Sequence, residues 1–145
     1  MIISSNTYFG YFPDFNDGAL LISASNKGLV LLLDIFRDLA DDKVHIHNIN
    51  QLEGFVAFGE TKLSIKSSTL ESSFKKIDDN KFLWNITRST SERFYNLALS
   101  LLRSDKPGHQ YFDTGCDDAT VIISKGEYDI AFFQSLGNNK KYKSR

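Results

Sequence analysis

The chain has 145 residues, of which 17 are Lys or Arg and 18 are Asp or Glu, so its formal net charge is −1. This length suits one domain that buries its own core, and a hydrophobic content of 41% argues against general disorder. A single cysteine excludes an internal disulfide and favours a reducing compartment. The near-neutral charge argues against a dedicated nucleic-acid binder, which would be strongly basic.

Signals for export or membrane insertion are not evident in the sequence. The first six residues lack the cationic stretch and apolar core that a signal peptide needs. The longest apolar run, residues 29–33, is far shorter than the roughly 20 residues of a membrane span. We therefore expect a cytoplasmic protein without membrane contact.

The first part of the chain predicts two strands and a helix. The apolar run at residues 18–23 predicts a short buried strand, and residues 1–12 predict another. Ser25 or Asn26 can cap a helix over about residues 27–40, which Asp41 and Asp42 end. Val30, Leu31 and Ile35 widen the core-facing stripe of this helix, so we expect heavy burial. The stripe itself consists of Leu29, Leu32, Leu33, Phe36 and Ala40.

The middle of the chain predicts an antiparallel meander of about four strands. Residues 43–49 alternate in the manner of a strand. Gly59-Glu60 is expected to join residues 54–58 and 61–67 as a hairpin. A second pair of strands, residues 72–77 and 81–87, flanks the turn residues 78–80, whose side chains can bond their own backbone.

A second helix follows, since Ser89-Thr90-Ser91-Glu92 matches the capping box S-x-x-E. Strands are then predicted over residues 109–113 and 119–124. The predicted fold is α+β, with an antiparallel sheet of about five to seven strands and two main helices packed on it. We expect one domain over residues 1–137 and a basic, frayed tail over residues 138–145.

Charge is distributed unevenly along the chain. Residues 1–60 carry three basic and eight acidic residues, a balance of −5, whereas residues 61–145 carry 14 basic and ten acidic residues, a balance of +4. Four aspartates align along one face of the first helix and its end, where they repel one another and oppose the helix dipole. These are Asp34, Asp38, Asp41 and Asp42. They form either an acidic patch for a basic partner or an ordinary solvated face.

Two of the three histidines suggest a metal site. His45 and His47 lie two apart on a predicted strand and would face the same side. Further ligands could come from His109, Asp113 and Cys116. The alternative is the polar outer face that antiparallel sheets commonly have. Phosphate-binding, dinucleotide-binding, zinc-protease and serine-hydrolase motifs are absent from the sequence, and no cofactor is expected.

Other residues could carry chemistry, each with a simpler explanation. Cys116 could act as a nucleophile beside a histidine, but a free cysteine more often behaves as a small buried hydrophobe. Asp113, Asp117 and Asp118 could act in acid–base chemistry or bind a divalent cation. Aspartate is also favoured in turns, which we consider the better explanation of this group.

The sequence PGHQYFD at residues 107–113 is followed by VIISKGEY at residues 121–128. With the helix before it, this pattern resembles the C-terminal part of small bacterial immunity proteins, which are encoded beside polymorphic or contact-dependent growth inhibition toxins. The resemblance covers residues 92–128, under a third of the chain, and contains no catalytic signature. It implies a non-enzymatic protein that binds its toxin through a variable surface, so it transfers no individual functional residue.

The resemblance and the acidic first part together favour an immunity protein that occludes the active or substrate-binding surface of a cognate toxin domain. If the toxin is a nuclease, acidic side chains would mimic phosphates in its basic site. The candidate partner-binding residues are Asp34, Asp38, Asp41 and Asp42, together with Asp14 and Asp17.

Two other functions remain open at this point. One is a non-catalytic adaptor or subunit of another bacterial assembly. The other is a metal-dependent enzyme built on His45, His47 and His109. An exposed sheet edge or apolar patch would allow a homodimer in any of these cases.

Overall fold

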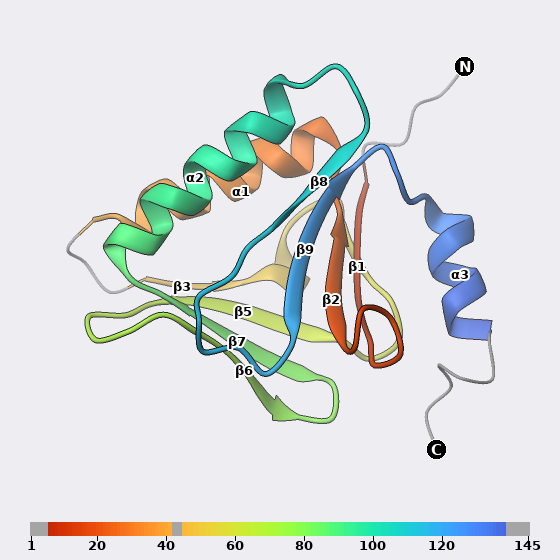
Figure 1. Ribbon diagram of the computed structural model, residues 1–145, viewed down its shortest axis with the longest axis horizontal. Helices are drawn as coiled ribbons and strands as arrows, with labels where there is room; N and C mark the ends of the chain where they lie inside the picture. The colour runs from red at the N-terminus through yellow and green to blue at the C-terminus, as the bar shows by residue number, and fades with distance from the viewer. Residues whose placement is uncertain (1–5, 42–44, 139–145) are drawn as a thin grey trace.

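A computed structural model describes residues 6–41 and 45–138 of the chain, with side chains up to residue 136. The fold is α+β, as predicted, with strands in two sheets rather than one (Figure 1). The helices are α1 (Asn26–Leu39), α2 (Arg88–Arg103) and α3 (Ile130–Asn138). The strands are β1 (Thr7–Phe12), β2 (Ala19–Ser23), β3 (Ile46–Asn48), β4 (Phe55–Ala57), β5 (Lys62–Ser67), β6 (Ser73–Asp78), β7 (Lys81–Ile86), β8 (Gly108–Tyr111) and β9 (Thr120–Lys125).

Both sheets mix parallel and antiparallel pairs, so the prediction of one antiparallel sheet was wrong in its pairing. The five-stranded sheet has the order β4-β1-β2-β9-β8, in which β1–β4 and β2–β9 are parallel. The four-stranded sheet has the order β3-β5-β7-β6, in which β5–β7 is parallel. The predicted hairpin of β6 and β7 is confirmed as an antiparallel pair.

The other predicted hairpin does not form. Gly59 has a positive φ of 64° and lies between β4 and β5, but the two strands belong to different sheets. The residues Gly59-Glu60 indicate only that the chain turns there, and they do not indicate which strands pair. β5 instead pairs with β7, and β4 pairs with β1, although Phe55 of β4 and Leu63 of β5 both reach the main core.

Helix α1 begins as predicted, because the Ser25 hydroxyl oxygen accepts a hydrogen bond from Gly28 N at 3.0 Å. Its inner face is buried through most of the predicted stripe, but Val30 is 45% exposed. The N-cap of helix α2 is Thr87, two residues before the predicted Ser89. Thr87 accepts a hydrogen bond from Thr90 N, and Ser72 Oγ lies 3.1 Å from Thr87 Oγ1.

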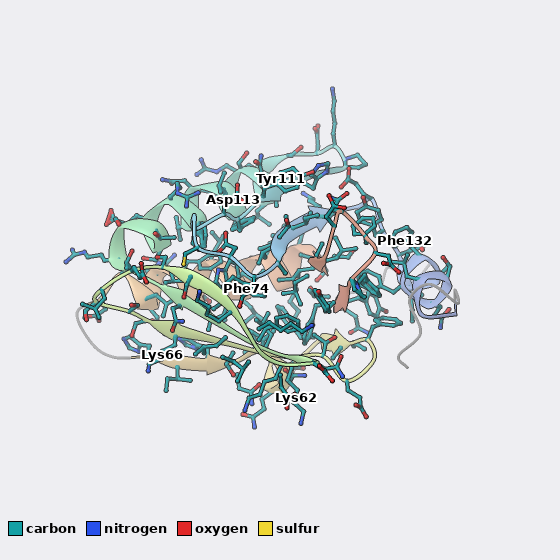
Figure 2. The ribbon with its side chains drawn as sticks, turned by 60° about the horizontal axis from the view of Figure 1, so that its bottom comes forward. Lys62, Lys66, Phe74, Tyr111, Asp113 and Phe132 are labelled. Carbon is teal, nitrogen blue, oxygen red and sulfur yellow. The ribbon has the colours of Figure 1, made fainter. Side chains whose placement is uncertain are left out.

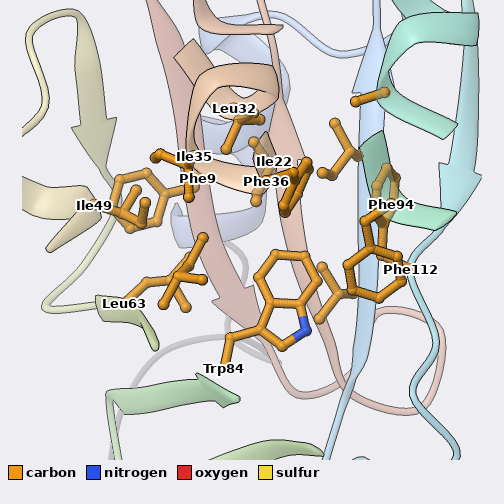
Figure 3. Close-up of a cluster of buried hydrophobic side chains, with 14 of the residues drawn as sticks. Phe9, Ile22, Leu32, Ile35, Phe36, Ile49, Leu63, Trp84, Phe94 and Phe112 are labelled. Carbon is orange, nitrogen blue, oxygen red and sulfur yellow. The ribbon is translucent and has the colours of Figure 1, made fainter. Parts of the chain in front are cut away.

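Four buried aromatic rings join α1, α2, the four-stranded sheet and the end of β8 (Figure 3). Phe36 lies on α1, Trp84 on β7, Phe94 on α2, and Phe112 directly after β8. Every pair of rings is in contact, with centroid distances from 5.1 to 6.2 Å. We call these residues the four-ring cluster. Such contacts combine large apolar burial with geometric preference, so the cluster fixes how the two helices sit on the sheet.

A second core lies on the other face of the five-stranded sheet. Side chains of β2 alternate between the cores: Leu20 and Ile22 face the main core, and Ala19 and Leu21 face the second. Burial on both faces explains the continuous apolar run that predicted this strand.

Helix α3 covers the second core with Phe133 and Leu136 and was not predicted (Figure 1). The start of this helix is marked locally in the sequence by Asp129. Its Oδ1 accepts a hydrogen bond from Phe132 N at 2.9 Å in the manner of a helix cap. Among the helices of residues 6–41 and 45–138, none is both long and apolar enough to cross a membrane. The predicted tail lies outside the described residues apart from Asn138.

We expect Phe36→Ala to lower the free energy of unfolding by about 3–5 kcal/mol, because it removes buried surface and leaves a cavity in the four-ring cluster. Urea unfolding can be followed by the emission of Trp84, the only tryptophan of the chain. Val30→Ala on the same helix is the control and should change the free energy by less than about 0.5 kcal/mol. Equal losses from the two substitutions would contradict the role given to the cluster.

Candidate functional site

Three of the predicted aspartates lie on the outer side of α1 and at its end. Asp34, Asp38 and Asp41 are all exposed, and we call them the acidic face. Asp34 Oδ1 lies 4.0 Å from Arg37 Nη1, and Asp38 Oδ2 lies 3.6 Å from His47 Nε2. Both contacts are longer than a hydrogen bond and leave the carboxylates open to solvent. Asp42, the fourth predicted member, lies outside the described residues.

Arg37 neutralises this face only in part. Its Nη2 donates to the hydroxyl oxygen of Tyr95 on α2 at 3.2 Å, and its guanidinium carbon lies 5.6 Å from the centre of the Tyr95 ring. The hydrogen bond to Tyr95 raises the pKa of Arg37, and the carboxylates of Asp34 and Asp38 raise it further. Arg37 therefore stays charged and is directed toward α2, while Asp34 keeps only a long, exposed contact with it.

An open groove of about 910 Å³ begins at Asp41. It runs between the end of α1, the loop of residues 67–72 and the start of α2. Glu71 and Glu92 line the groove together with Arg88, and Arg88 Nε lies 3.9 Å from Glu92 Oε1. Leu70, in the same lining, is 92% exposed. The acidic face thus continues into a concave surface that carries a protruding leucine.

The remaining two predicted aspartates lie elsewhere. Asp14 and Asp17 are exposed in the turn between β1 and β2, which Figure 1 shows on the side of the molecule that carries α3, away from the end of α1. Asn16 and Asp17 have positive φ values of 50° and 58°, a conformation that Asn and Asp tolerate better than most residues. Turn geometry therefore accounts for Asp17.

The segment that carries the family resemblance forms a hydrogen-bonded junction between α2, β8 and β9. His109 Nδ1 lies 2.9 Å from Glu127 Oε1, and the buried Ser124 hydroxyl donates to the same carboxylate oxygen at 2.7 Å. Lys125 Nζ donates to the carbonyl oxygens of Leu101, at 3.2 Å, and Leu102, at 3.1 Å, and so satisfies the end of α2. Ser124 hydrogen-bonds Glu127 and not His109, so this is not a serine activated by a histidine base.

The predicted three-histidine set does not form. His109 lies on β8 of the five-stranded sheet, whereas His47 lies on β3 of the other sheet and His45 just before it. Within residues 6–41 and 45–138, the one group of three or more His, Cys, Asp or Glu close enough for a metal consists of Asp38, His45 and His47. Helix α1 supplies the carboxylate that the sequence did not link to these histidines.

The loop after β8 fastens one sheet to the edge of the other. Asp117 Oδ1 accepts a hydrogen bond from Phe74 N at 3.1 Å, and Asp118 Oδ2 accepts one from Lys76 N at 2.9 Å. Asp117 Oδ2 also accepts a hydrogen bond from Thr114 N at 2.9 Å, which is the local contact expected of a turn residue. Cys116 Sγ lies 3.5 Å from Lys75 Nζ, and this contact raises the pKa of Lys75.

Charged side chains of the opposite sign gather on the four-stranded sheet. Lys62 and Lys66 of β5 are exposed, and Figure 2 shows them projecting from its solvent side, while Phe74 lies toward the interior. Tyr111 and Asp113 lie on the opposite side of the molecule in the same view. Lys66 also lines the groove that begins at Asp41, so basic and acidic side chains meet there.

Replacing Glu127 by alanine should lower the free energy of unfolding by about 1–3 kcal/mol, because it deprives the buried Ser124 hydroxyl of its shorter hydrogen bond. Urea unfolding with Trp84 emission measures the change. Glu92→Ala removes an exposed carboxylate from an ion pair within one helix and should lower it by about 1 kcal/mol or less. If the two variants are equally stable, the junction does not have the structural role assigned to it.

The chain was compared with protein-family models, curated proteins and solved structures, and none of the three comparisons gives a match. A function for this chain must therefore be inferred from its own residues and their geometry.

Proposed function

We propose that this chain is a bacterial immunity protein that binds a cognate toxin domain in the cytoplasm and neutralises it by occluding its active or substrate-binding surface. The observation that carries the proposal is the acidic face on α1, which is exposed and continues into the groove beside Leu70. The resemblance of residues 92–128 to immunity proteins supports the same function. The protein acts by binding and catalyses no reaction.

The electrostatics of α1 favour a basic partner. Asp34 and Asp38 repel each other one turn apart, and acidic residues near the C-terminus of a helix oppose its dipole. This arrangement destabilises the free protein, and a partner with a positive surface would relieve it. A nuclease has such a surface where it binds phosphates, and charge complementarity would speed encounter with it.

The groove also offers an apolar side chain, Leu70, beside the acidic residues. Specific protein interfaces commonly have a buried apolar centre within a polar rim. Leu70 projects almost fully into solvent, and the acidic residues Asp41, Glu71 and Glu92 lie along the same groove. The basic residues Lys66 and Arg88 also line it, so the charge of the groove is mixed. In the proposed complex Leu70 enters a pocket of the toxin, and the carboxylates around it face basic side chains.

The double variant Asp34→Lys/Asp41→Lys should associate with the toxin domain at least about tenfold more slowly at low salt, because charge steering acts mainly on the association rate. Asp38 is left unchanged because it contacts His47. Surface plasmon resonance at several salt concentrations, with the toxin domain encoded by the neighbouring gene, measures this rate. The matched control is Glu60→Lys/Asp105→Lys, which makes the same change in net charge in exposed loops and should associate close to the normal rate.

Co-expression of this chain with the toxin domain tests the proposed function in cells. The neighbouring gene is expected to encode a secreted protein with a C-terminal toxin domain, and this chain should protect cells that produce that domain. If both double variants slow association equally, net charge and not the acidic face is responsible. If no toxin is encoded nearby and no protection is seen, the proposal fails and the adaptor function is favoured.

A further inference from the structure

Two histidines and one carboxylate converge where α1 ends and β3 begins. Asp38 lies in the last turn of α1, His47 lies on β3, and His45 directly precedes that strand. One ligand atom from each of the three side chains lies within 4.8 Å of the other two. His47 Nε2 lies 3.6 Å from Asp38 Oδ2.

The backbone holds the two imidazoles in place. β3 pairs with β5, with His47 opposite Ile65. His45 N donates to Ser67 Oγ at 2.9 Å, and Ser67 N donates to the His45 carbonyl oxygen at 2.9 Å. Because side chains alternate along a strand, both rings point to one side while Ile46 between them is 66% exposed on the other. The rings lie nearly parallel, with centroids 6.2 Å apart and an angle of 18° between their planes.

A second observation concerns the hydrogen bonds of the two imidazoles. The Nε2 atoms of His45 and His47 are both buried from solvent, and neither has a hydrogen-bond partner among the described residues. Buried polar atoms are nearly always paired, since an unpaired one has lost its contacts with water without replacement. Asp38 does not provide the missing partner, because 3.6 Å is beyond hydrogen-bond distance.

We propose that Asp38, His45 and His47 bind one divalent first-row transition-metal ion such as Zn²⁺. Two imidazole nitrogens and a carboxylate oxygen are a typical ligand set for these ions, and three protein ligands leave a further coordination position for water or a partner group. Tetrahedral ligands at zinc–nitrogen distances lie about 3.3 Å apart, so an ion requires the three side chains to close by roughly 1.5 Å or less. Side-chain rotation supplies this without moving the strand.

A simple ion pair between Asp38 and His47 explains less of the geometry. It leaves the buried Nε2 of His45 without a hydrogen-bond partner among the described residues. A metal ion satisfies both nitrogens at once and neutralises the carboxylate. This inference concerns the chain alone and does not rest on the proposed toxin binding.

Zn²⁺ titration of the full chain without a polyhistidine tag, by calorimetry in competition with a chelator, tests the proposal. One ion per chain should bind, and the midpoint of thermal unfolding should rise in a saturable manner with Zn²⁺ concentration. Co²⁺ should give visible absorption bands that depend on the same residues. His45→Ala, His47→Ala and Asp38→Asn should each weaken Zn²⁺ binding at least about tenfold.

The matched control is His109→Ala, which removes the third histidine of the chain from its contact with Glu127 and should leave Zn²⁺ affinity unchanged. Urea unfolding with Trp84 emission verifies that each variant is folded. The proposal is overturned if the unmodified chain shows no saturable binding of one Zn²⁺, or if His45→Ala and His47→Ala bind it as well as the unmodified chain. Loss of binding in His109→Ala alone would place the ion elsewhere.

Discussion

The mutual packing of Phe36, Trp84, Phe94 and Phe112 is the interaction on which the rest of the structure depends. These rings come from α1, β7, α2 and the end of β8, and each one is fully buried and contacts the other three. Because Phe36 anchors the inner side of α1, the aspartates of the same helix are held outward over a rigid support. The positions of Asp34 and Asp38 therefore depend on an apolar contact on the opposite side of the same helix.

Features that depend on neighbouring residues could be predicted from the sequence. The Ser25 cap, the buried run of β2 and the hairpin of β6 and β7 follow from side-chain spacing, capping and turn chemistry. Pairing between strands that are distant in sequence could not be predicted, because it depends on tertiary contacts. A sequence can show that β4 and β5 are separated by a bend, but not that they enter different sheets. Helix α3 was missed although its cap at Asp129 is a local signal.

In the candidate site, too, the features set by neighbouring residues could be predicted and those set by tertiary contacts could not. Helical spacing was enough to align Asp34, Asp38 and Asp41, because a helix places residues by their separation in sequence. It could not place the turn of Asp14 and Asp17 on another side of the molecule. The approach of Asp38 to His45 and His47 depends on how α1 packs over β3, which is a tertiary contact. His109, which the sequence grouped with the other histidines, instead pairs with Glu127 in the other sheet.

The loop that follows β8 has a consequence for self-association. Its residues form hydrogen bonds with backbone groups on the outer edge of β6. Phe74 N donates to Cys116 O, and Asp118 N donates to Phe74 O. Lys76 N donates to the carboxylate of Asp118. An edge strand with unpaired amides is a template on which another chain can add a strand, and closing it guards against aggregation. In the four-stranded sheet this closure leaves β3 as the edge where a foreign strand could be added. Any strand recruited there would lie beside Asp38 and the two histidines.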